Sequence, residues 1–310
     1  MFHGLTDLEH GGLENCQHKH LHVSRFEGIM SHLARNYKVL SMDEAVRHLQ
    51  ERSKLPPFSA VITFDDGFAS NYHLAFPVLR RYNLPAIIYL ATEFVDQKKP
   101  IWVDRVDYVM NRTGGTKMEL VATKKRLKGL SHEHTLNEVR LLEEKIGQGL
   151  GDVSGPDVPS IYRALEWPQI REMASSGLIS YGSHTHSHII LGRAEPDRIL
   201  KELKTSRAII ETETGLSCRH FCYPNGTPED FSETSEAILK DLKFKSSVTT
   251  MGGMNRTPCS PFSLKRLGIT NDLRPAQTIQ YLALGDASAR GLLPKLLGAL
   301  RSSSNVDAQY

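Results

Sequence analysis

The sequence predicts an α/β fold built around a largely parallel sheet. Short apolar runs recur along the chain, each bounded by turn residues, and helical patterns lie between them. Strand-like runs that alternate with helices are typical of βαβ units, in which consecutive strands run parallel. The composition is that of a globular protein, with 40% hydrophobic and 24% charged residues, so the chain has ample apolar material for a core.

The predicted elements follow in chain order. A first helix is expected over residues 24–36, where Ser24 and Glu27 form a capping box at its start. Its apolar residues fall on one face, which we expect to pack on the sheet: Phe26, Ile29, Met30 and Leu33. The expected strands are AVITF at 60–64, AIIYLAT at 86–92, LISYGS at 178–183, HFCYP at 220–224, SSVTT at 246–250 and LKRLGIT at 264–270.

The pattern changes between residues 102 and 160. A charged helical stretch, HEHTLNEVRLLEEKIG, is followed there by GDVSGPDVPS, which is rich in Gly, Pro and Asp. This predicts a helical insertion, a small subdomain or lid within a main domain of residues 1–275. Residues 276–310 are expected to form a short basic amphipathic helix and a polar tail. Weak contact of that helix with a membrane surface is one reading, and ordinary packing is the other.

Net charge and cysteine content exclude several classes of protein. A formal charge of +3 and a pI of about 8.6 are too mild to indicate nucleic-acid binding, and no basic run is interleaved with aromatic residues. The four cysteines form no CxxC pair, which argues against a disulfide scaffold and a structural zinc site. No apolar run reaches the length of a transmembrane helix, and MFHGLTD does not resemble an export signal. We therefore expect a cytoplasmic location, which an upstream segment would reverse.

Two adjacent carboxylates, Asp65 and Asp66, end the apolar run at 60–64, and Gly67 follows them. In parallel α/β folds the carboxyl ends of the strands carry the active site. Neighbouring carboxylates repel each other and lose hydration there, so a cation or a shared proton must offset them. A helix N-cap followed by a solvated acid would explain one aspartate but not the pair.

Histidines follow another predicted strand, in GSHTHSHII at 182–190. His184 and His188 are four residues apart, so a helical turn would place both imidazoles on one face and direct His186 elsewhere. Two histidines and one carboxylate make a three-ligand site with open positions, as in catalytic metal centres. A histidine pair alone is weak evidence for a metal site, and the prediction depends on its combination with the aspartate pair.

Three motifs together resemble a known family. TFDDG at 63–67, HTHSH at 184–188 and FCYPNG at 221–226 are similar, in order and spacing, to the first three motifs of the NodB-homology polysaccharide deacetylases, carbohydrate esterase family 4. The resemblance covers the chain from residue 1 to about 270. It implies a distorted (β/α)7 barrel with a metal at its C-terminal mouth.

The resemblance also implies roles for individual residues. Asp66, His184 and His188 would hold a divalent metal, most often zinc, with cobalt or nickel serving in relatives. Asp65 would be the general base toward the attacking water, and the backbone N–H of Tyr223 would stabilise the oxyanion.

The chain departs from the common family pattern at the general acid. Most members use a histidine of an L-x-H motif near the C-terminus, yet no histidine follows His220. The branch that resembles poly-N-acetylglucosamine deacetylases is circularly permuted and uses a histidine of an N-terminal strand. MFHG matches that strand at His3, which is our candidate for the general acid. The alternative is a frayed terminus with no role.

A second departure concerns the arginine that relatives often bond to the catalytic base. Phe221 takes its place, and Arg266 is our candidate for the orienting arginine, with Arg219 as the alternative and a surface role as an equally open reading for both. Trp102 and Asp104 follow a predicted strand and are candidates to line a sugar cleft, with core packing as the alternative for the tryptophan.

The sequence therefore predicts a metal-dependent hydrolase that removes N-acetyl groups from amino sugars of a surface polysaccharide or its glycan precursor. An O-acetyl glycan esterase is the nearest alternative, because an alkoxide leaves more easily than an amine. A catalytically silent carbohydrate-binding scaffold is the third reading.

Overall fold

The computed structural model describes residues 1–269, apart from residues 148, 156 and 257. These residues lie within one compact unit, Met1–Asn271. The predicted C-terminal helix and tail, 276–310, fall outside the described residues. In the described part, no helix is both long enough and apolar enough to span a bilayer.

The main sheet of the described part has five strands, all parallel, in the order β5-β6-β7-β8-β9. Neighbours in this sheet are consecutive along the sequence, so each connection is a crossover that passes over one face. The five strands lie inside the five apolar runs predicted between residues 60 and 250, which confirms the α/β class. Their bounds are β5 Ile62–Phe64, β6 Ala86–Leu90, β7 Ile179–Ser183, β8 His220–Cys222 and β9 Ser246–Val248.

The first residues of the chain pair with β5. Phe2 and Phe64 form a parallel bridge. The N–H of Phe2 donates to the carbonyl of Thr63 at 2.9 Å, and its carbonyl accepts from the N–H of Asp65 at 3.0 Å. Phe2 is buried, so the N-terminal segment is a packed part of the sheet edge and not a frayed terminus.

The segment after β9 pairs with that strand, at the edge of the sheet opposite β5. Val248 and Leu264 form a parallel bridge, and hydrogen bonds of 2.9 and 3.1 Å join Met1 to Leu267 and Ile269. The strand expected at 264–270 is therefore present as a single bridge within the described residues. The sheet is a curled parallel one, and the full (β/α)7 count implied by the resemblance stays a prediction.

Two short parallel pairs accompany the main sheet. β1 (Gly4–Thr6) pairs with β2 (His20–His22), and β3 (Lys38–Val39) pairs with β4 (Ser59–Ala60). The helices that lie between the strands are α1 Val23–Asn36, α2 Met42–Gln50, a π-helical turn Asn71–Ala75, α3 Phe76–Tyr82, α4 Thr92–Asp96, α8 Trp167–Ser175, α9 Pro196–Thr214 and α10 Glu233–Asp241.

Helix α1 buries the predicted apolar face but begins differently from the prediction. Its N-cap is His22, whose side chain accepts a hydrogen bond from the N–H of Ser24. The expected Ser24 capping box is therefore wrong. Strand β2 runs directly into the helix, so its last residue supplies the acceptor that the free N–H groups of the first turn require.

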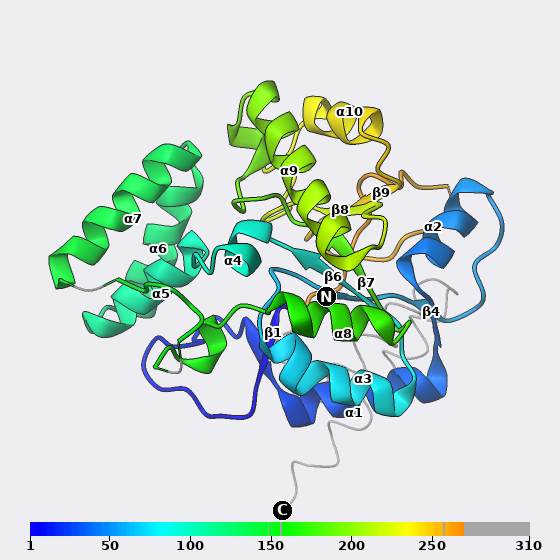
Figure 1. The fold of residues 1–310 in the computed structure, drawn as a ribbon, viewed down its shortest axis with the longest axis horizontal. Helices are drawn as coiled ribbons and strands as arrows, with labels where there is room; N and C mark the ends of the chain where they lie inside the picture. The colour runs from blue at the N-terminus through cyan, green and yellow to red at the C-terminus, as the bar shows by residue number, and fades with distance from the viewer. Residues whose placement is uncertain (148, 156, 257, 270–310) are drawn as a thin grey trace, which may run out of the picture. The chain divides into compact units, whose positions relative to one another are not determined.

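Three helices occupy the region predicted as an insertion. They are α5 (Trp102–Arg112), α6 (Lys117–Lys128) and α7 (His132–Ile146). They pack on one another and stand as a group beside the sheet (Figure 1). Thr116 and Glu119 form a capping box at the start of α6, which explains why a helix begins there. The role of this group as a lid stays a prediction.

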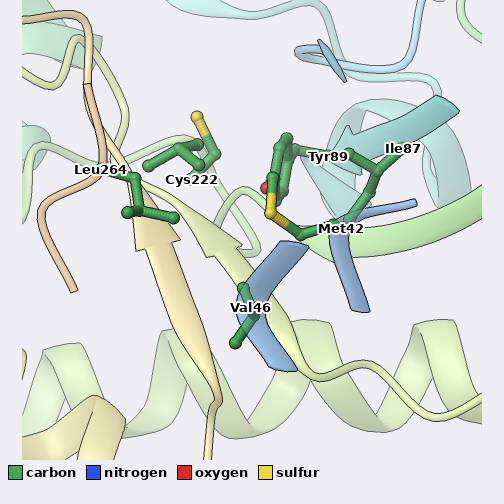
Figure 2. Close-up of a cluster of buried hydrophobic side chains, with 7 residues drawn as sticks. Met42, Val46, Ile87, Tyr89, Cys222 and Leu264 are labelled. Atoms are coloured by element: carbon green, nitrogen blue, oxygen red, sulfur yellow. The ribbon is translucent and has the colours of Figure 1, made fainter. Parts of the chain in front are cut away.

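A cluster of buried apolar side chains fastens α2 to the sheet (Figure 2). Met42 and Val46 of α2 meet side chains from β6, β8, β9 and the segment after β9. Fully burying a side chain of this size contributes about 2 kcal/mol. The cluster includes Cys222, the last residue of β8, and its packing holds the carboxyl end of that strand in place. Its members are Met42, Val46, Ile87, Tyr89, Cys222, Val248 and Leu264.

Candidate metal centre and active site

The two predicted carboxylates lie where β5 ends, and the backbone turns sharply there. Asp66 has φ 76°, a left-handed conformation that is uncommon for a residue other than glycine, and Gly67 has φ 99°. A Cβ at Gly67 would lie 2.9 Å from the side chains of Leu90 and Val95. The turn therefore requires glycine, and it leaves both aspartate side chains buried at the carboxyl edge of the sheet.

Asp66 lies between two histidine rings. Its Oδ1 is 3.4 Å from Nε2 of His184 and 3.4 Å from Nε2 of His188. The ring centroids are 4.9 Å apart. The three ligand atoms all lie within 4.8 Å of one another, and Asp66 Oδ1 is buried with no hydrogen-bond partner. A buried, unsatisfied carboxylate oxygen facing two imidazole nitrogens fits a divalent cation.

The tautomer of His184 is fixed by a second contact. Its Nδ1–H donates to the backbone carbonyl of Cys222 at 2.8 Å. In the neutral ring the lone pair is then on Nε2, which faces Asp66. Such an outer hydrogen bond is the usual support for a histidine that binds metal.

The loop that carries these histidines is not a helical turn. Residues 184–188 lie outside helices, with Thr185 at φ 65° and His188 at φ 55°. The expectation that a helix brings the imidazoles together is wrong, although the two rings do meet. As expected, His186 points elsewhere: its Nδ1 is hydrogen-bonded to Oγ1 of Thr92 at 2.9 Å.

A buried carboxylate on α9 holds this loop. Glu202 is 2% exposed and accepts from the N–H of His186 at 2.9 Å and of Ser187 at 2.8 Å. It also accepts from the hydroxyl of Ser187 at 2.8 Å. These three hydrogen bonds to one charged group offset the conformational cost of the left-handed residues Thr185 and His188. They therefore explain the conformation of the loop.

Asp65 points to a different partner. Both of its oxygens accept from Arg266, at 2.7 and 2.8 Å. Arg266 is 7% exposed and also donates to the carbonyl of Thr249 at 2.7 Å. Burial raises the pKa of Asp65, but the charge and hydrogen bonds of Arg266 outweigh it and lower the pKa to about 2. The structure therefore brings Arg266, and not Arg219, to the candidate base; Arg219 lies at the surface, 3.4 Å from Asp43.

His3 lies on the N-terminal segment beside β5, near both aspartates. Its carbonyl accepts from the side chain of Asn71 at 2.8 Å. Burial lowers the pKa of His3 to about 4, against the charges of Asp66 and Asp65, which raise it. The ring is therefore neutral at pH 7 in this state and must take up a proton before it can donate one.

Tyr223 directly follows β8 and is the residue predicted to supply an oxyanion donor. Its backbone N–H donates to the carbonyl of Val248 at 3.2 Å, which places it in the pairing with β9. Its side chain is fully buried, and its hydroxyl donates to the carbonyl of Phe262 at 3.3 Å. The N–H that the prediction assigns to the oxyanion thus takes part in a sheet hydrogen bond here. The oxyanion role of Tyr223 stays a prediction.

A lysine that no motif pointed to lies at the centre of the site. Lys19 Nζ is 2.9 Å from Oδ2 of Asp66 and 3.0 Å from Oδ1 of Asp104. Asp104, in the first turn of α5, is 2% exposed, and burial raises its pKa to about 6 against the charge of Lys19. Trp102 is also buried, so packing and not an open sugar cleft describes its surroundings. The sequence holds no signal for Lys19, since its partners are distant in the chain.

Comparison with known proteins tests the resemblance inferred from the motifs. Residues 52–247 match the family model described as Polysaccharide deacetylase. The chain belongs to the polysaccharide deacetylase family. The resemblance inferred from the three motifs is thereby confirmed at the level of the family.

Two curated relatives are 23% and 25% identical to this deacetylase. YxkH of Bacillus subtilis is 23% identical over 246 residues, 79% of this chain and 64% of that protein. The poly-beta-1,6-N-acetyl-D-glucosamine N-deacetylase of Staphylococcus epidermidis is 25% identical over 205 residues, 64% of this chain and 50% of that protein. The chain thus spans between half and two thirds of the length of these relatives.

Solved structures share the fold. The Streptococcus pyogenes deacetylase PplD in complex with acetate superposes with a TM-score of 0.64 at 19% identity, covering 91% of this chain and 96% of that one. IcaB from Ammonifex degensii gives a TM-score of 0.61 at 20% identity, with 91% and 94% covered. At these identities the likeness shows the fold alone.

Proposed function

We propose that this protein is a metal-dependent hydrolase that removes N-acetyl groups from amino sugars of a surface polysaccharide or its glycan precursor. Its membership in the polysaccharide deacetylase family supports the reaction class. The Staphylococcus epidermidis relative, named as an N-deacetylase of poly-N-acetylglucosamine, supports the choice of bond and sugar. The observation that carries the proposal is an Arg266-paired Asp65 directly beside the group of Asp66, His184 and His188.

Asp66, His184 and His188 would hold the cation. One carboxylate oxygen and two imidazole nitrogens suit zinc, and also cobalt or nickel. When bound, a divalent cation lowers the pKa of water and polarises a carbonyl oxygen. Three protein ligands leave positions open for substrate, whereas a structural zinc site is closed by four.

Asp65 is the general base in this proposal. It takes a proton from the water that attacks the acetamide carbonyl carbon. Arg266 keeps the carboxylate ionised at neutral pH and, through its two hydrogen bonds, fixes the plane of the carboxylate. The remaining lone pairs of the carboxylate oxygens are available to accept the proton.

His3 is the general acid in this proposal. Cleavage of the C–N bond leaves an amine that must be protonated as it departs. The hydrogen bonds of Phe2 to β5 hold the neighbouring His3 at the same end of the sheet as the aspartate pair. This arrangement suits the permuted branch of the family, in which the acid precedes the other motifs.

O-acetyl glycans are the second candidate class of substrate, and the burial of His3 is the reason to consider them. The low pKa of His3 leaves it a poor proton donor at pH 7. An ester needs less help, because its alkoxide leaves more readily than an amine. An O-acetyl esterase is therefore the alternative function of the same site.

The test is acetate release by zinc-reconstituted protein from N-acetylated and O-acetylated oligosaccharides, with Asp65→Asn as the variant. We expect release from the N-acetylated substrate to fall by about 10²- to 10⁴-fold in Asp65→Asn while bound zinc is retained. Asp197→Asn, at an exposed position in the first turn of α9, is the matched control. No release from either substrate by zinc-loaded protein would instead favour a carbohydrate-binding scaffold.

A further inference from the structure

Lys19 connects two buried carboxylates that belong to different parts of the fold. It stands in the loop before β2, and its Nζ lies 4.5 Å from the centroid of the Phe68 ring. On one side it contacts Oδ2 of Asp66 at 2.9 Å, and on the other Oδ1 of Asp104 at 3.0 Å. Both carboxylates are 2% exposed, so solvent screens these contacts poorly.

The two oxygens of Asp66 therefore have different surroundings. Oδ2 is bound by the ammonium group of Lys19, whereas Oδ1 is buried without a hydrogen-bond partner and faces the two histidines. Lys19 thus occupies one oxygen of Asp66 and leaves the other facing the two imidazoles. Asp104 in turn holds Lys19, and its Oδ2 is also buried without a partner.

We propose that Lys19 is a positioning residue that sets the metal preference of this site by occupying Oδ2 of Asp66 and neutralising one of two neighbouring carboxylates. The inference rests on the proposed function, since it concerns the same metal. It names a determinant outside the ligands themselves.

The physical reason is the different demand of hard and borderline cations. Manganese and magnesium favour several oxygen ligands and a high negative charge. Zinc is satisfied by two imidazoles and one carboxylate oxygen. With Lys19 in place, the site offers one oxygen and little net charge, which disfavours the hard cations. Without it, Asp66 offers both oxygens and the nearby charge of Asp104 is uncompensated.

The test compares Lys19→Met with the wild-type chain. Methionine keeps an unbranched side chain and loses the charge. Zn²⁺ and Mn²⁺ are titrated separately into chelator-stripped full-length protein at one pH, and the two dissociation constants are measured by calorimetry or indicator competition. We expect Mn²⁺ to bind Lys19→Met at least about tenfold more tightly, relative to Zn²⁺, than it binds the wild type.

Two further variants sharpen the result. Lys99→Met removes a lysine that pairs with Glu93 at the surface, and it is expected to leave both constants unchanged. Asp104→Asn keeps an oxygen that can accept from Lys19 but removes the negative charge, so the positive charge of Lys19 acts on Asp66 alone. This variant is expected to weaken the binding of both metals.

The outcomes separate this inference from the proposed function. A wild-type chain that binds neither metal would overturn the proposed metal site and this inference with it. If the wild type binds zinc and folded Lys19→Met shows the same Mn²⁺ to Zn²⁺ ratio, then only the role of Lys19 is refuted. Loss of all metal from folded Lys19→Met would also refute it, because Lys19 would then be needed for binding and not for preference.

Discussion

Arg266 and Asp65 form a buried ion pair with two hydrogen bonds, although 201 positions separate them in the chain. The pair joins the segment after β9 to the end of β5. It therefore contributes to the closure of the fold as well as to the state of the candidate base.

Arg266→Met is expected to lower the stability of the fold and to raise the pKa of the candidate base. Removing one partner of a buried pair leaves an uncompensated charge and destabilises a protein by about 3–5 kcal/mol. The pKa of Asp65 should then rise above its ordinary value, because burial is no longer offset, and the acidic limb of the activity profile should move to higher pH. Denaturant unfolding and the pH profile of acetate release measure the two effects.

Arg219→Met is the matched control for this variant. Arg219 pairs with Asp43 at the surface, where both side chains are more than half exposed. The free energy of unfolding should change by less than about 1 kcal/mol, and the pH profile should not move. An Arg266→Met protein that behaved like Arg219→Met would contradict the assigned role.

Metal retention should depend on His188 and not on its neighbour His186. His188→Ala removes an imidazole that faces Asp66, whereas His186→Ala removes one that bonds Thr92. We expect the first variant to lose most of its bound zinc after dialysis and the second to keep it, as measured by elemental analysis. Equal zinc content in both variants would place the metal elsewhere.

Glu202 is expected to affect metal binding without touching the metal. Glu202→Ala removes the acceptor of two backbone N–H groups in the loop that carries His188, and buried unsatisfied donors cost about 1–3 kcal/mol each. The zinc dissociation constant should rise, and amide exchange at His186 and Ser187 should accelerate. Glu213→Ala, which breaks an exposed pair with Arg171, should change neither quantity.

The sequence predicted the parts of this site that depend on neighbouring residues. Asp65 and Asp66 were found because two adjacent charges at the end of a buried strand need a cation or a shared proton to offset them. The histidine loop was found by spacing, but its shape was not, because Glu202 lies on another element and overrides the local helical preference. Lys19 carried no signal, and Asp104 was a candidate only for a sugar cleft, since their pairing exists only when distant segments meet. The motif at Tyr223 likewise did not reveal that its N–H pairs with the carbonyl of Val248.

Stability should fall as the pH rises through the titration of Asp104. Burial raises its folded pKa from 3.8 to about 6, so the folded state holds this proton more tightly than the unfolded state does. The contribution is fully present below about pH 4 and is lost as the pH rises through 6, by roughly 3 kcal/mol. Asp104→Asn cannot titrate and should remove this slope from the free energy of unfolding measured between pH 4 and 7. A slope that persists unchanged in the variant would assign the proton to another group.

His3 should matter more for an amide than for an ester. His3→Ala removes the proposed proton donor, which a departing amine requires and a good alkoxide or phenoxide does not. Acetate release from an N-acetylated oligosaccharide should drop by about 10²-fold or more, while hydrolysis of an activated acetate ester should change by less than about tenfold. His10→Ala is the control, since His10 bonds Thr6 and Glu14 away from the aspartate pair. Equal losses on both substrates would mean that His3 supports the site structurally, because the leaving group would then make no difference to its effect.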